Sequence, residues 1–196
     1  MKQIAVLFLL AMSLYYIYLG WRVLFTRRPF IVSSGLLMSF ALLINLVQIV
    51  REAVRISQTG NLEGKEIILL AVTIFVGVKC WQLRRSYQVI GLADDLSPAL
   101  KNALTNNQLN YCEQPGIIKV PTLPGAIGYE FKDSKNESSF NFKGSFSATT
   151  IVNVLQQLEK YFTTHPFTIN KKAAYEMCGL GMISLALSLA LLFYWL

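Results

Sequence analysis

Three long apolar segments precede one polar insert and a fourth follows it, and this arrangement limits the possible folds of the chain more than any other feature. Only 15% of the residues are charged, whereas a soluble domain carries about a quarter. An α-helix rises about 1.5 Å per residue, so roughly 20 apolar residues cross a hydrocarbon core. The pattern predicts a membrane α-helical protein with four transmembrane helices, at about residues 4–25, 30–54, 66–84 and 171–196. A soluble domain at residues 86–170 is then inserted between the third helix, which ends near residue 85, and the last helix.

Two of the four segments need a further argument. Ile67–Val78 contains only about a dozen uncharged residues, so it spans a bilayer only if the ammonium group of Lys79 extends to the headgroups. The first segment follows Lys2 and resembles a signal peptide. However, residues 15–18 are mainly tyrosine, and a cleavage site requires small residues. We therefore interpret the first segment as an uncleaved membrane helix.

The basic residues are distributed unevenly between the two sides that four crossings define. Outside the domain itself, eight lie near helix ends on the side of the soluble domain, namely Arg22, Arg27, Arg28, Lys79, Arg84, Arg85, Lys171 and Lys172, and four lie opposite, namely Lys2, Arg51, Arg55 and Lys65. The side of a membrane protein that has more Lys and Arg residues in its loops is usually cytoplasmic. This predicts a cytoplasmic domain with both chain termini outside, and a bacterial inner membrane is the default location. All of the eight except Lys79 are also candidate contacts for lipid headgroups.

The connection between the first two apolar segments is very short. Arg27, Arg28 and Pro29 separate them. We therefore expect the first two helices to form an antiparallel hairpin and to pack side by side.

A polar stripe is expected on the second helix. Asn45, Gln48, Glu52 and Arg55 recur at intervals of three and four residues, which places them on one helix face. An amide in hydrocarbon prefers a hydrogen-bonding partner. Three interpretations remain open for this face: packing between helices, a path for an ion or proton, and docking of another membrane subunit.

Small residues recur along the second and last helices, and Gly35 to Ser39 and Ser184 to Ser188 have a spacing of four. Such spacing allows two helix backbones to approach closely. The residues are Gly35, Ser39, Gly181, Ser184 and Ser188. They favour packing within the chain, and homo-oligomerisation is the alternative.

The polar insert predicts a small α+β domain with the order strand, helix, strands, helix. Its first helix follows Asp94, Asp95, Ser97 and Pro98, in which Asp95 or Ser97 caps the helix. Its last helix is capped by Ser147 or Thr149. Alternating and β-rich stretches predict strands at Tyr87–Leu92, Ile117–Val120, Ala126–Phe131 and Ser139–Phe142, with a polar hairpin tip at residues 133–137. Each of the two helices has one apolar face, formed by Leu96, Leu100 and Leu104 in the first and by Ile151, Val154, Leu155, Leu158 and Phe162 in the last. Helices covering one face of a mostly antiparallel sheet bury these apolar stripes.

No group of residues predicts catalysis, a metal site or a cofactor. Cys80, Cys112 and Cys178 lie far apart, and His165 is the only histidine. Capping explains Asp94 and Asp95 better than chelation does. The net charge of +7 comes from helix ends, because residues 86–170 contain six lysines and seven acidic residues. Nucleic-acid binding is therefore not expected.

These observations predict a membrane protein that is not an enzyme. The leading hypothesis is an accessory, regulatory or assembly protein whose cytoplasmic domain docks a protein partner, either a membrane protein or a cytoplasmic one. Membrane lipid is the other expected partner. The alternative is a small transporter or channel component, in which Asn45 and Gln48 line a path across the membrane.

Overall fold

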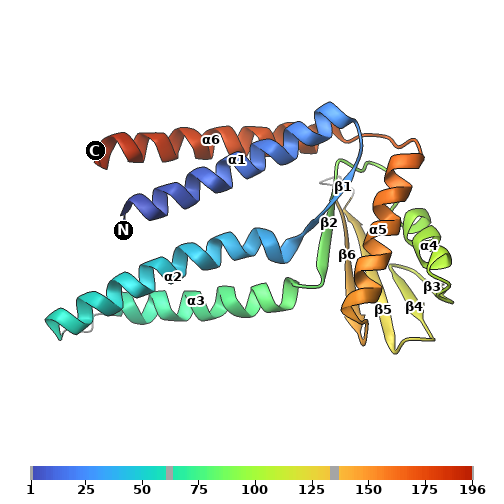
Figure 1. The fold of residues 1–196 in the computed structure, drawn as a ribbon, viewed down its shortest axis with the longest axis horizontal. Coiled ribbons are helices and arrows are strands. Elements are labelled where there is room, and N and C mark those ends of the chain that lie inside the picture. The colour runs from blue at the N-terminus through green and yellow to red at the C-terminus, as the bar shows by residue number, and fades with distance from the viewer. Residues whose placement is uncertain (1, 61–63, 133–136, 196) are drawn as a thin grey trace.

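A computed structural model describes residues 2–60, 64–132 and 137–195 of the chain (Figure 1). Four long helices extend from one side of an α+β domain, and the start of the first and the end of the last lie far from that domain (Figure 1). The long helices are α1 (Lys2–Thr26), α2 (Ser34–Thr59), α3 (Gly64–Leu83) and α6 (Lys171–Trp195). The predicted hairpin tip falls largely on residues 133–136, which lie outside the described residues.

Three of the long helices contain segments that are long and apolar enough to cross a membrane. These segments are Val6–Thr26, Glu66–Leu83 and Lys171–Phe193. Only a minority of each apolar stretch is buried in the protein, namely 28%, 11% and 11% respectively. Apolar helices that remain this exposed need lipid or a partner around them. The crossing predicted for the second helix remains a prediction.

The predicted helix over residues 30–54 is wrong over its first turn. Phe30–Ser33 forms a strand, β1, which pairs antiparallel with β2 (Ser86–Ile90) so that Phe30 lies opposite Ile90. Aromatic and β-branched residues suit a strand, and the backbone of β2 supplies the hydrogen bonds. The helix that follows continues to Thr59, and Gly60 ends it with a φ of 70° and an N–H bond of 2.8 Å to the Ile56 carbonyl.

The predicted hairpin of the first two helices is also wrong. The structure pairs α1 with α6 and α2 with α3 (Figure 1). Arg27 adopts a left-handed conformation with a φ of 51° where α1 ends, and the chain then enters β1 before α2 begins. The strand therefore separates α1 from α2, and each helix packs along a different neighbour.

Small residues bring α1 and α6 into close contact. A Cβ atom added to Gly181 would lie 2.9 Å from the backbone nitrogen of Ile17 and 2.9 Å from the carbonyl oxygen of Ser13. One turn further along α6, the Ser184 hydroxyl accepts a hydrogen bond of 2.8 Å from the Ser13 hydroxyl. The expectation that the small residues of the last helix pack within the chain is confirmed at these positions.

Among its described residues, the α+β domain contains one antiparallel sheet of six strands in the order β1-β2-β6-β5-β4-β3. The remaining strands are β3 (Cys112–Gln114), β4 (Ile117–Val120), β5 (Gly125–Lys132) and β6 (Glu137–Gly144). The predicted strand at Ile117–Val120 is confirmed, and the next two are longer than predicted. Two strands were not predicted: β3, which is short, and β1, which comes from outside the insert.

Helices α4 (Ser97–Asn106) and α5 (Ala148–Thr164) bury their apolar faces against this sheet. The Ser147 hydroxyl caps α5 as predicted, because it accepts a bond of 3.0 Å from the Thr150 N–H. Among the most deeply buried side chains are Leu100, Leu104, Ile118, Ile127, Phe140, Leu158 and Phe162. The apolar stripes predicted on both helices therefore form the core of the domain.

A second apolar cluster joins the long helices to the sheet. Leu19 and Val23 of α1 and Ala174 of α6 are buried against Phe30, Val32 and Ile90 of β1 and β2. Alternate residues of β1 thus face two cores, since Ile31 packs on the core of the domain. Buried side chains on both faces hold the domain in place relative to α1 and α6.

Candidate functional site

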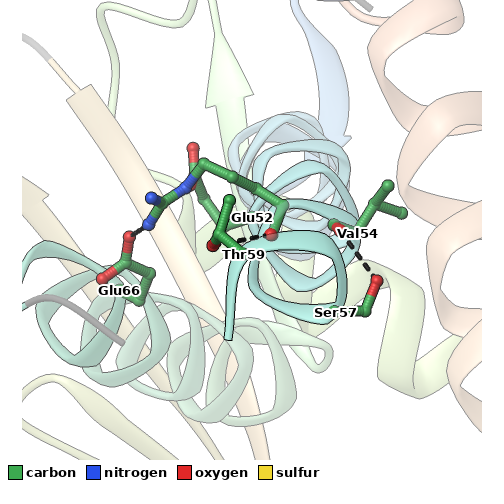
Figure 2. Close-up of polar contacts among 6 residues, drawn as sticks. Glu52, Val54, Ser57, Thr59 and Glu66 are labelled. Atoms are coloured by element: carbon green, nitrogen blue, oxygen red, sulfur yellow. Dashed lines mark hydrogen bonds and ion pairs between the residues drawn. The ribbon is translucent and has the colours of Figure 1, made fainter. Parts of the chain in front are cut away.

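Charged side chains meet where α2 and α3 pack together, far from the α+β domain. The Arg55 Nε donates to Glu52 Oε2 over 2.7 Å, one turn earlier on α2. Its Nη2 pairs with Glu66 Oε1 on α3, and Figure 2 shows this contact as a dashed line at Glu66. We call these three residues the charged cluster. It links the two helices through the guanidinium group.

The surroundings of the charged cluster are apolar. The Glu66 side chain is only 6% exposed, compared with 21% for Glu52 and 30% for Arg55. A cavity of about 240 Å³ adjoins the two carboxylates, and its other lining residues are Ile49, Ala53, Ile56, Ile67, Leu69 and Leu70. Charged groups in such surroundings are stable only when they are paired, so each charge depends on the others.

Local sequence explains where each charge lies. Glu52 and Arg55 are three residues apart, which places them on one helix face. Glu66 lies in the first turn of α3, where the positive end of the helix dipole favours a carboxylate. At this end of α2, the Thr59 hydroxyl donates a hydrogen bond of 3.0 Å to the Arg55 carbonyl (Figure 2).

The structure brings together only part of the predicted polar stripe. Glu52 and Arg55 meet in the charged cluster, whereas Gln48 is exposed and Asn45 is half-buried. Sequence reasoning missed Glu66, which it placed at the start of the third helix without giving it a role. Glu66 could have been identified because it is a carboxylate directly before an apolar segment and lies only a few residues after the helix that contains Arg55.

The predicted headgroup residues near the domain lie in different surroundings. The guanidinium of Arg22 lies over the ring of Phe30 at 4.8 Å, and that of Arg84 lies over Trp81 at 3.9 Å. Lys172 is 4.0 Å from Glu176, one turn along α6. Arg27, Arg28 and Lys171 are exposed.

Arg85 is bound within the domain. Its guanidinium donates hydrogen bonds to the carbonyl oxygens of Gly144 at 2.7 Å and Phe146 at 3.3 Å. These carbonyls lie between β6 and α5, so Arg85 connects the end of α3 to this turn.

Another polar group joins β3 to α4. The Glu113 carboxylate accepts hydrogen bonds from Lys101 at 2.6 Å, Ser97 at 2.8 Å and Tyr129 at 3.2 Å. The bond from Lys101 is the main reason that the pKa of Glu113 lies below its usual value, and the same bond raises the pKa of Lys101. The group is open to solvent, so it orients β3 more than it stabilises the fold.

The acidic pair before α4 is bound to backbone groups. Asp95 accepts from the Ser97 N–H at 3.1 Å, and Asp94 accepts from the Thr168 N–H at 2.8 Å. Leu96, rather than Asp95 or Ser97, occupies the position before the helix. Within the part of the chain that the structure describes, no three His, Cys, Asp or Glu side chains gather as metal ligands.

Comparison of the chain with protein-family models, with curated proteins and with solved structures finds no match.

Proposed function

We propose that this chain is an integral membrane protein with four crossings, and that its α+β domain docks a protein partner on the cytoplasmic side. Its role is that of an accessory, regulatory or assembly protein. The fourth crossing is supported by the path of the chain. Helix α2 begins beside the sheet and packs along α3, and α3 returns to the sheet. Because α3 contains Glu66–Leu83, which is long and apolar enough to cross a membrane, α2 beside it crosses the same thickness.

The observation that carries the docking proposal is the open edge of the sheet at β3. Cys112, Glu113 and Gln114 are all exposed, and no strand among the described residues pairs with the outer side of β3. The opposite edge strand, β1, contacts α5 and continues directly into α2. An open edge accepts an extended segment of another protein through backbone hydrogen bonds. The Glu113 hydrogen bonds hold β3 in position for such a partner.

Photo-crosslinking from the edge tests this docking. With benzoylphenylalanine at Gln114, we expect a single protein adduct of defined mass after illumination of intact membranes, because the partner strand lies against this position. The same group at Asn153, which is exposed on α5, is the matched control and should yield no such adduct. Absence of an adduct at Gln114, or equal adducts at both positions, would contradict the proposal.

The orientation has a separate test through Cys112, which is exposed on β3. In a protein with Cys80→Ser and Cys178→Ser, a membrane-impermeant maleimide should react with Cys112 in inverted vesicles and not in intact cells. The reason is the excess of basic residues on the side of the domain. Equal labelling in both preparations, or labelling only in intact cells, would contradict a cytoplasmic position of the domain.

A transporter or channel component is the second candidate. The buried Glu66 beside a cavity favours it, because ionisable groups inside membranes often mark a path. However, the carboxylates of the charged cluster bind Arg55, and the cavity beside them is lined mainly by aliphatic side chains. Pairing between α2 and α3 is therefore the better explanation of these charges.

A further inference from the structure

A second cavity lies where α1 ends beside the α+β domain. Its volume is about 460 Å³, which suits a small polar group. The lining comes from α1, the connection to β1 and helix α5, and consists of Arg22, Phe25, Thr26, Arg28, Pro29, Phe30, Glu159 and Thr163. We call this cavity the interfacial pocket.

The interfacial pocket offers two guanidinium groups to a ligand. Arg22 lies over the Phe30 ring at 4.8 Å, which holds its guanidinium in place. Within the described residues, neither Arg22 nor Arg28 forms an ion pair with a carboxylate. Two unpaired arginines at one cavity suit a phosphate, because guanidinium donors match its oxygens.

The aromatic surface next to the pocket points to a lipid as the source of that phosphate. Phe25 is 77% exposed and lines the pocket, and Trp21, which is 61% exposed, stacks on it with ring centroids 6.1 Å apart. Both belong to an apolar helix segment that ends at Thr26. Exposed aromatic rings at the end of such a segment are typical of the membrane interface. Acyl chains of a lipid can pack on these rings, whereas a soluble phosphate has no acyl chains.

Glu159 and Thr163 restrict which lipid headgroups fit the pocket. Two arginines and one glutamate carry a net charge of +1, which matches a phosphodiester with a charge of −1 and no other charged group. The carboxylate and the hydroxyl accept hydrogen bonds from headgroup hydroxyls. A choline headgroup has no such donors.

We propose that the interfacial pocket binds an anionic glycerophospholipid with a hydroxylated headgroup, such as phosphatidylglycerol. The phosphodiester lies between Arg22 and Arg28, the headgroup hydroxyls reach Glu159 and Thr163, and the acyl chains run along Phe25 and Trp21. This inference rests on the proposed insertion of α1 in the membrane.

Quenching of Trp21 by brominated lipid tests the pocket. In a protein with Trp81→Phe and Trp195→Phe, reconstituted in phosphatidylcholine vesicles, brominated phosphatidylglycerol should bind near Trp21 about tenfold more strongly than brominated phosphatidylcholine does. Arg22→Gln with Arg28→Gln should reduce this preference to about equal. The matched control is Arg84→Gln, an interfacial arginine outside the pocket, and it should keep the preference.

The other outcomes each have a distinct meaning. Equal quenching by both lipids in the parent protein, or equal loss of preference in the Arg84 variant, would overturn the pocket and leave membrane insertion intact. If glycerol phosphate binds the parent protein and not the Arg22→Gln, Arg28→Gln variant, while the parent shows no preference for brominated phosphatidylglycerol, the pocket takes a soluble phosphate ester instead of a lipid and the proposal is overturned. Absence of quenching by either lipid would overturn both the pocket and the insertion of α1.

Discussion

Replacement of Arg55 with leucine should lower the free energy of unfolding in detergent by about 3 kcal/mol. The change removes the guanidinium that Glu52 and Glu66 share, and leaves two carboxylates beside an apolar cavity. Removal of one partner from a buried ion pair costs about 3 to 5 kcal/mol. The lower end applies here because the Arg55 side chain keeps 30% of its surface exposed. Unfolding of the purified protein by a denaturing detergent measures the change.

Arg51→Leu is the matched control for this prediction, because Arg51 is an exposed arginine on the same helix. Its removal should change the unfolding free energy by less than about 1 kcal/mol. Adding Glu52→Gln and Glu66→Gln to Arg55→Leu should recover much of the loss, since amides do not carry the charges that need the guanidinium. If Arg55→Leu is as stable as Arg51→Leu, the charged cluster does not hold α2 and α3 together.

Replacement of Gly181 with leucine should separate α1 from α6 and lower the unfolding free energy by about 3 kcal/mol. The first side-chain atom alone would lie 2.9 Å from two backbone atoms of α1, and backbone atoms cannot move aside as a side chain can. The helices must therefore move apart, and the bond between Ser13 and Ser184 is lost. In a background without other cysteines, Ser13→Cys with Ser184→Cys should cross-link on oxidation, and Gly181→Leu should suppress the cross-link.

Gly179→Leu is the matched control for the packing of α6. A Cβ atom at Gly179 meets nothing within 4 Å, and the position is exposed on the same helix. Leucine there should preserve both the stability and the cross-link. If leucine at Gly181 is tolerated as well as leucine at Gly179, α1 and α6 do not pack as the structure has them.

Local patterns predicted most of the domain. The apolar spacing on Leu100 and Leu104 and the alternation in Ile117–Val120 depend on the helical and extended periods of the chain, which neighbouring residues determine. The cap at Ser147 likewise involves residues only three apart. Such features were recognised because each one needs only nearby residues.

The errors concern residues that meet across long stretches of chain. Phe30–Ser33 looked like the start of a membrane helix because its apolar side chains suit both lipid and a protein core. Only β2, which lies beyond two helices in the sequence, supplies the backbone partners that make it a strand. Glu66 was overlooked for a related reason, since its role depends on Arg55 across the turn between α2 and α3.

The amino-acid order alone established the apolar helices, the polar domain between them and the alternation within its strands. It did not establish which helices would be neighbours, because a bilayer-spanning surface is equally apolar on many sides and small residues permit several pairings. The folded chain decided that α1 packs on α6 and that β1 joins the sheet. Packing at Gly181 and backbone pairing at β1 select partners through shape and hydrogen bonds, which exist only once distant segments are brought together.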